Sequence, residues 1–110
     1  MTALRALLRP AAALLLAGAP LCAPAADAAA GRAKAQACAV CHGALGIATA
    51  PDAPHLAGQP EIYLAAQLKA YRGGSRVHEV MAVMAKPLSD DDIANLAAWF
   101  ASIKVSAAPP

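Results

Sequence analysis

The sequence contains few aromatic side chains and little charge. Its 110 residues include one tryptophan, two tyrosines and one phenylalanine, and only 15% are charged. Two of the nine basic residues, Arg5 and Arg9, precede residue 26, whereas all seven acidic residues follow it, so residues 26–110 hold seven bases against seven acids. A neutral domain of this kind lacks the basic surface that nucleic acids or anionic membranes attract. We therefore expect neither as a partner.

A domain this short and this poor in large side chains makes only a small hydrophobic core. A small domain with so few large side chains gains little stability from its own core, and a disulfide, a metal or another added group often supplies the rest. We therefore expect a bound group to contribute apolar surface to residues 26–110.

Long apolar runs are also missing. Residues 1–10 are basic without an acid, residues 11–21 are apolar, and small residues follow in two Ala-x-Ala patterns. An apolar run of this length is too short to span a bilayer. The arrangement is typical of a secretory signal peptide, and a permanent membrane helix is the weaker interpretation.

We expect the signal peptide to comprise residues 1–25 and the mature domain to comprise residues 26–110. The pattern permits cleavage after Ala25 or after Ala28, and we prefer Ala25. Cys22 would leave with the signal peptide. The mature domain would then be periplasmic, in an oxidising compartment.

The remainder of the sequence predicts helices. An alanine-rich stretch favours a helix over residues 28–39, and glycines and prolines predict a loop over residues 43–59. A proline at the first position and apolar residues at helical spacing predict a second helix over residues 60–72. A capping box followed by an apolar stripe predicts a last helix over residues 89–103. No stretch alternates with the strand period, so the predicted fold is all-α with three to four helices.

Cys38-Ala39-Val40-Cys41-His42 forms a C-x-x-C-H motif, which is typical of covalent haem attachment. Two thiols at this spacing bond to the two vinyl groups of one porphyrin, and the histidine then lies beneath the iron as an axial ligand. We set aside a redox-active dithiol, which needs a strand–helix–strand setting, and a zinc site, which needs a fourth ligand. With one such motif, the chain is expected to bind one haem c, with Cys38 and Cys41 as thioethers and His42 as an iron ligand.

The second axial position decides between an electron carrier and a haem enzyme or gas sensor, because a filled position leaves no site for a substrate at the iron. Met81, Met84, His78 and His55 are the candidates. A thioether raises the reduction potential relative to a second imidazole. The spacing alone does not choose between the two methionines.

The sequence resembles the class I c-type cytochromes, especially the small periplasmic monohaem proteins and the halves of two-domain dihaem cytochromes c. The resemblance implies the cytochrome c fold around one covalent haem. It covers nearly all of residues 26–110, through Gly31 and residues 38–43, 54–59, 63–68, 73–76, 81–84 and 88–100.

The resemblance implies roles for individual residues around the haem. In that family the first methionine of an M-x-x-M-x-x-x-L-S pattern is the sulfur ligand, which corresponds to Met81, whereas Met84 would pack on the haem. The carbonyl of Pro54 would accept a hydrogen bond from His42 and fix its orientation. Leu56 would pack on the macrocycle.

The resemblance also implies a close crossing of the first and last helices, where Gly31 would meet the face that carries Leu96 and Trp99. From their chemistry, Arg72 and Arg76 are possible partners of a haem propionate. The alternative for both arginines is a solvated helix end.

Together these features predict a periplasmic electron-transfer protein of the respiratory chain that is not an enzyme. Its partners would be redox complexes, such as a quinol-oxidising complex on one side and a terminal oxidase or reductase on the other, with no small-molecule substrate and no permanent membrane anchor. Two alternatives remain: a cytochrome subunit of a periplasmic dehydrogenase complex, and a haem enzyme or gas sensor with an open sixth coordination site.

Overall fold

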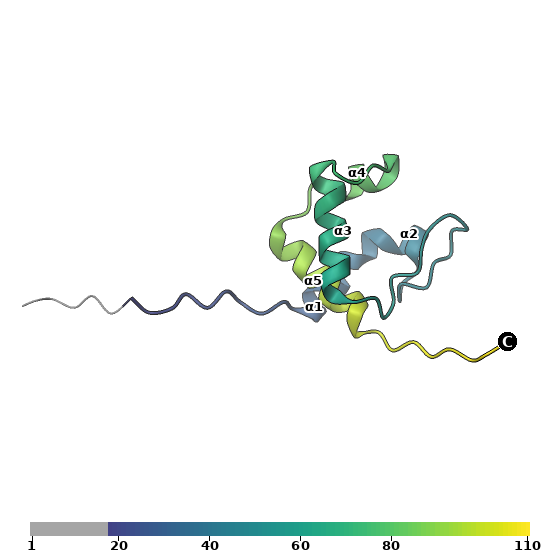
Figure 1. Cartoon of the computed structure of the whole chain (residues 1–110), viewed down its shortest axis with the longest axis horizontal. Coiled ribbons are helices and arrows are strands. Elements are labelled where there is room, and N and C mark those ends of the chain that lie inside the picture. Colours follow the sequence, from purple (N-terminus) through teal and green to yellow (C-terminus); the bar gives the residue numbers. More distant parts are fainter. Residues whose placement is uncertain (1–17) are drawn as a thin grey trace, which may run out of the picture.

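The computed structural model describes residues 18–110, so residues 1–17, with most of the predicted signal peptide, lie outside the described residues. No strand occurs within residues 18–110, and the all-α prediction is confirmed for this part of the chain. If the first three consecutive elements are counted as one helical run, four helical stretches are present, within the predicted three to four (Figure 1). The elements are α1 (Ala28–Lys34), a 3₁₀ turn η1 (Ala35–Cys38), α2 (Ala39–His42), α3 (Glu61–Gly73), α4 (Glu79–Ala85) and α5 (Asp90–Ser102).

The first helical run extends beyond the helix predicted over residues 28–39. It continues through a 3₁₀ turn into α2 and ends at His42, followed by Gly43 with a φ of 75°. Asp27 caps its start, because one carboxylate oxygen accepts hydrogen bonds from the Ala29 and Ala30 N–H groups at 2.8 and 3.2 Å. The C-x-x-C-H motif therefore forms the C-terminal end of a helical run, as the sequence indicated.

The expected crossing of the first and last helices is present. A Cβ atom added to Gly31 would overlap the carbonyl oxygen of Asn95 and would lie 2.9 Å from Trp99 Cβ. The Arg32 guanidinium lies over the Trp99 ring, 5.5 Å from its centroid. Only glycine at this position lets α1 and α5 approach so closely, and this crossing fixes the run that ends in the motif.

The hydrophobic core lies mainly between α3 and α5. Within the described residues it is small, and three of its seven buried hydrophobic members are alanines. Leu64 from α3 packs on Leu96 and Phe100 of α5. The capping box predicted at Ser89 is present, with Asp92 as its second member, whereas Pro60 is the N-cap of α3 and not its first helical residue. The small core agrees with the expectation that a bound group adds apolar surface.

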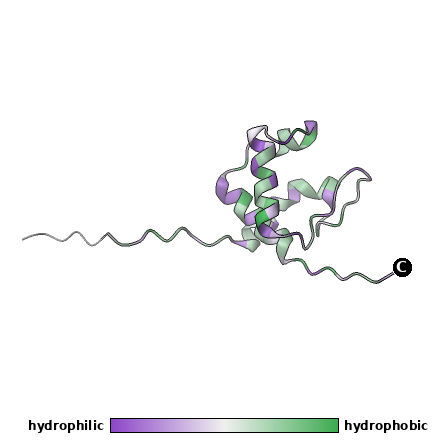
Figure 2. Cartoon of the chain, viewed as in Figure 1, coloured by the Kyte–Doolittle hydropathy of each residue, from purple (hydrophilic) through white to green (hydrophobic). Residues whose placement is uncertain are grey.

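The short helix α4 was not predicted from the sequence. Seven residues are too few for a clear apolar period, and its N-cap is His78, an uncommon capping residue. The helix packs on α3, and its surface is mostly apolar apart from its N-terminal end (Figure 2). None of the helices in residues 18–110 has the length and hydropathy that a bilayer crossing requires.

Candidate functional site

Cys38, Cys41 and His42 lie within a single turn of the first helical run. Their spacing of three and four residues places the side chains on the same face of the run. Both thiols are free, and the His42 side chain is buried, with 7% of its surface exposed. Val40, between the cysteines, is 83% exposed on another face. The motif thus presents two thiols and one imidazole in the same direction.

The His42 ring is oriented by a loop carbonyl. Its Nδ1 lies 2.9 Å from the carbonyl oxygen of Pro54, which is the hydrogen bond that the family resemblance implied. Because a carbonyl oxygen only accepts, Nδ1 must carry the hydrogen. In the neutral ring, the lone pair of Nε2 is then available to a metal, and a partner of this kind raises the basicity of a ligating histidine.

The loop that supplies Pro54 is fixed by its own backbone. The Cys41 carbonyl accepts hydrogen bonds from the N–H groups of Thr49 and Ala50 at 3.0 and 3.2 Å. The Gly46 carbonyl accepts two more, from Leu56 and Ala57, at 2.7 and 3.1 Å. These bonds hold the loop predicted over residues 43–59 against the motif, so the position of the Pro54 carbonyl is well determined.

Two histidines that the sequence analysis weighed as iron ligands cap backbone groups. His55 Nδ1 accepts a hydrogen bond from the Ala48 N–H at 2.8 Å, and His78 Nδ1 accepts one from the Met81 N–H at 3.3 Å. The first bond closes the loop beside the motif, and the second caps α4. No sequence pattern indicates either bond, because a histidine has no strong preference for either position.

Met81 and Met84 differ in exposure, although a spacing of three residues makes them neighbours on α4. Ala85 is fully buried, and Met81, four residues earlier, shares its face and is partly buried. Met84 is 38% exposed, and Val80, four residues before Met84, is 53% exposed. Met81 is thus the more covered of the two methionines.

Leu56 and Cys38 are brought together by the core. Both are partly buried and pack against the cluster that contains Leu96 and Phe100. Burial raises the pKa of the Cys38 thiol, so it stays protonated at neutral pH. Leu56 thus packs against the same core cluster as Cys38, although it follows Cys38 by 18 positions.

Arg72 and Arg76 both bond to protein groups near the end of α3. One Arg72 nitrogen donates to the Leu88 carbonyl at 2.9 Å, and the other donates to an Asp90 carboxylate oxygen at 2.6 Å. Arg76 donates to the Gln67 side chain at 2.6 Å and lies over the ring of Tyr71. Arg72 is partly buried among these partners, whereas Arg76 is exposed to solvent, as the alternative of a solvated helix end expected.

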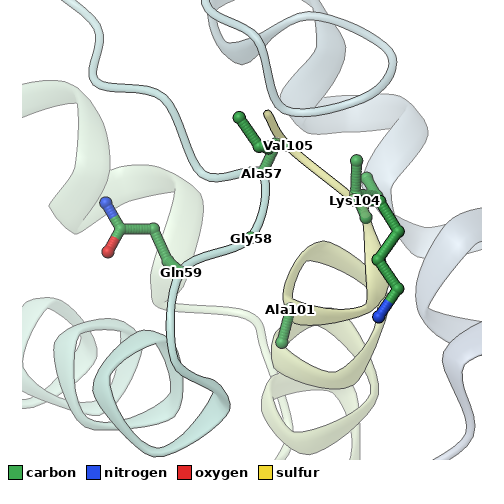
Figure 3. Close-up of a pocket in the computed structure, with 7 residues that line it drawn as sticks. Ala57, Gly58, Gln59, Ala101, Lys104 and Val105 are labelled. Atoms are coloured by element: carbon green, nitrogen blue, oxygen red, sulfur yellow. The ribbon is translucent and has the colours of Figure 1, made fainter. Parts of the chain in front are cut away.

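A surface hollow of about 500 Å³ lies between the turn at residues 57–59 and the end of α5 (Figure 3). Its lining combines the backbone of Gly58 with the side chains of Ala57, Gln59, Ala101, Ile103, Lys104 and Val105. It includes none of the predicted haem-binding residues. The hollow is therefore separate from the attachment site.

The described residues fit a covalently bound haem. The two free thiols have the spacing of vinyl attachment, and the His42 ring leaves one nitrogen for iron. Outside the small core, large apolar side chains remain uncovered, including Val77 at 89% and Val83 at 71% exposure. A polypeptide with these features has both the donors for a haem and apolar surface for it to cover.

Comparison with known proteins assigns the family. The profile of the cytochrome c family matches residues 28–104, which is most of the chain. The chain belongs to the cytochrome c family, as the sequence indicated. Its cofactor is one covalently bound haem c, and its fold is the cytochrome c fold.

Three known proteins illustrate the similarity. The chain is 50% identical to cytochrome c4 of Pseudomonas aeruginosa over 80 residues, 73% of this chain and 40% of the relative. It is 47% identical to cytochrome c-554(548) of Halomonas halodenitrificans over 79 residues, 69% of this chain and 95% of the relative. It also resembles the solved thiosulfate dehydrogenase of Marichromatium purpuratum, with a TM-score of 0.67 and 41% identity over 74% of this chain and 20% of that one. The chain thus spans less than half of cytochrome c4 but nearly all of the shorter relative.

Proposed function

We propose that this chain is a periplasmic electron-transfer protein that carries single electrons on its one haem. The observation that carries the proposal is the placement of Cys38, Cys41 and His42 on one helical face, with the His42 ring fixed by the Pro54 carbonyl. The haem supplies the redox chemistry, because its iron cycles between the ferric and ferrous states. The fixed ring supports fast electron transfer, since a ligand that does not move needs little reorganisation.

In this proposal, Cys38 and Cys41 hold the haem as thioethers, and His42 and Met81 are the axial ligands of its iron. The lower exposure of Met81 compared with Met84 supports this choice. Leu56, which contacts the same core cluster as Cys38, packs on the macrocycle and excludes water from it. Because both axial positions are filled, the chain catalyses no bond chemistry and is not an enzyme.

Asp27 supports cleavage of a signal peptide comprising residues 1–25. Its side chain caps α1, and its own N–H donates to the Asn95 side chain at 2.7 Å, which ties the start of α1 to α5. Cleavage after Ala25 keeps this residue, whereas cleavage after Ala28 removes it together with the cap. We therefore expect the mass of the purified mature protein to correspond to residues 26–110 plus one haem.

The partners in this proposal are redox proteins met through transient contacts, such as a quinol-oxidising complex and a terminal oxidase. A second candidate function is a cytochrome subunit of a periplasmic dehydrogenase complex. The similarity to a thiosulfate dehydrogenase structure favours this second candidate. Purification from the native host distinguishes the two: a free carrier elutes at the size of one domain, whereas a subunit elutes with a stoichiometric dehydrogenase.

A redox titration tests the proposed function. Purified wild-type protein should titrate as a single one-electron wave, and Met81→Ala should lower the midpoint potential, because a thioether favours ferrous iron. Met84→Ala is the matched control at the more exposed methionine of α4 and should change the potential much less. If ferric wild type is high-spin and binds cyanide as readily as Met81→Ala does, the sixth site is open and the carrier function is wrong.

A further inference from the structure

We infer that Arg72 is a positioning residue for Met81. It ties the end of the segment comprising residues 77–88, here called the methionine segment, to helix α3. The inference rests on the proposed function, because it matters only if Met81 is an axial ligand. It assigns to Arg72 two protein partners, the Leu88 carbonyl and the Asp90 carboxylate.

Arg72 lies in the last turn of α3 and donates two hydrogen bonds across to the start of α5. One nitrogen bonds to the Leu88 carbonyl at 2.9 Å, and the other bonds to Asp90 at 2.6 Å. Leu88 is the last residue of the methionine segment, and Asp90 is the first residue of α5. The guanidinium thus bonds to the last residue of the methionine segment and to the first residue of α5.

This contact is the one hydrogen bond between the methionine segment and another part of the described chain. The other hydrogen bonds found for residues 77–88 stay inside the segment: the N–H of Met81 bonds to His78, and the N–H of Leu88 bonds to the Ala85 carbonyl. Apolar packing supplies the rest of the attachment, through the fully buried Ala85 and the partly buried Leu88. Without Arg72, the segment would rest on α3 through apolar contacts and through the edge-on contact of the His78 ring with the Tyr71 ring, with no hydrogen bond between them.

The two bonds of Arg72 contribute unequally. The Asp90 side chain is 75% exposed, and an ion pair so close to water adds little to stability. The hydrogen bond from Arg72 lowers the pKa of the Asp90 carboxyl further below neutral pH, and the charged carboxylate orients the guanidinium. The hydrogen bond to the Leu88 carbonyl is part-buried. Removing the donor from a buried carbonyl costs more stability than breaking an exposed ion pair, because the carbonyl is left without a partner. The bond to Leu88 therefore carries most of the effect.

The entrance of the methionine segment is held independently. The Arg76 backbone N–H donates to the Ala70 carbonyl at 3.1 Å, and its side chain donates to Gln67 at 2.6 Å, both on α3. Loss of Arg72 would therefore free one end of the segment while the other stays attached. Met81 would remain close to the iron but would leave it more often, which opens the sixth position to an external ligand.

Imidazole binding to the ferric holoprotein measures how often Met81 leaves the iron. We expect Arg72→Ala to bind imidazole about ten-fold more tightly than wild type, a factor that corresponds to about 1.4 kcal/mol. Arg72→Lys should lie between the two, because an ammonium group cannot fork between two acceptors. Asp90→Asn should differ from wild type by less than Arg72→Ala does.

Lys34→Ala is the matched control. It removes an ion pair of comparable exposure, Lys34 to Asp92 at 3.1 Å, which joins α1 to α5 without contacting the methionine segment. Its imidazole affinity should equal that of wild type, even if both variants unfold at a lower denaturant concentration. A rise in affinity as large as that of Arg72→Ala would show a general loss of stability and overturn the inference.

Met81→Ala separates failure of the inference from failure of the proposed function. If Met81→Ala binds imidazole much more tightly than wild type while Arg72→Ala and Arg72→Lys do not, only the role of Arg72 is wrong. If Met81→Ala and wild type bind imidazole equally, Met81 is not the ligand, and both the proposed axial ligation and the inference are overturned. Arg72→Lys keeps the test available if Arg72→Ala does not fold.

Discussion

Residues 38–59 and residues 74–89, which the proposed function places on opposite faces of the haem, are held in different ways. The first stretch is closed by backbone hydrogen bonds around Cys41 and Gly46 and by the bond from His42 to Pro54. The second, between its entrance at Arg76 and the cap at Ser89, rests on apolar packing, on the contact of His78 with Tyr71 and on the bonds of Arg72. The histidine side is thus fixed by many local contacts, whereas the methionine side depends on a few distant ones.

This difference predicts separate roles for the two proposed axial ligands. In the proposed ligation, a histidine fixed by the backbone would keep the haem in place in both oxidation states. A methionine on a lightly attached segment would be the ligand that leaves first on heating, in denaturant or in the presence of a competing ligand. Changes in residues 38–59 should therefore affect haem retention, and changes in residues 74–89 should affect the sixth ligand.

The largest effect is expected from the attachment cysteines. Replacing Cys38 and Cys41 by alanine should abolish covalent haem attachment and leave the chain largely unfolded, because its own core is small. Haem staining on a denaturing gel and far-UV circular dichroism measure the two effects. Cys22→Ala is the matched control, and it should have no effect on the mature protein if residues 1–25 are removed. Haem retained by the double variant would contradict the proposed attachment.

A change at the crossing of α1 and α5 should be next in size. Gly31→Ala places a methyl group against the Asn95 carbonyl, which forces the helices apart. We expect a loss of about 3 kcal/mol in the free energy of unfolding, at the upper end of the usual cost of overpacking. Guanidinium unfolding of the ferric holoprotein measures it.

Gly73→Ala is the control for this variant, because nothing lies within 4 Å of a Cβ at that helical position. It should leave the stability unchanged or raise it slightly, since alanine is the better helix former. Equal losses in both variants would show that the tight crossing is unimportant.

The two capping histidines offer a direct comparison of the two sides. His78→Ala removes the cap on the Met81 N–H and should weaken α4 by about 1 kcal/mol, with a matching rise in the affinity for external ligands. His55→Ala removes an equivalent bond to the Ala48 N–H and should lower stability without changing that affinity. Imidazole titration of the two ferric variants measures this affinity. If His55→Ala raises it as much as His78→Ala does, the two sides are not held independently.

The smallest effect is expected in the free energy of unfolding at acid pH. The Ser89 N–H and the Lys34 ammonium hold the pKa of the Asp92 carboxyl below its usual range. The stabilisation by this group is therefore fully present above the ordinary carboxyl pKa of about 3.9 and is lost as the pH falls through the lower folded-state value. Asp92→Asn should flatten this part of the curve of stability against pH, whereas Asp91→Asn, with no such partner, should not.

The motif side of the site could be predicted from the residues themselves. The C-x-x-C-H motif indicates covalent haem attachment by itself. The capping box at Ser89 begins α5, and glycines with positive φ occur in the predicted loop, both as expected. The methionine side could not be predicted in this way. Its helix α4 is too short to show a helical period of apolar residues. The N-cap His78 and the Arg72 hydrogen bond to Leu88 depend on contacts that no local sequence pattern predicts. The choice of Met81 came from the family resemblance alone.

The near-infrared absorption of the ferric protein tests the proposed axial ligation most directly. Sulfur ligation to ferric haem iron produces a weak charge-transfer band there, and we expect this band in wild type and in Met84→Ala but not in Met81→Ala. Loss of the band in Met84→Ala alone would show that Met84, and not Met81, is the sulfur ligand. Absence of the band from wild type would contradict methionine ligation and, with it, the proposed carrier with a filled sixth site.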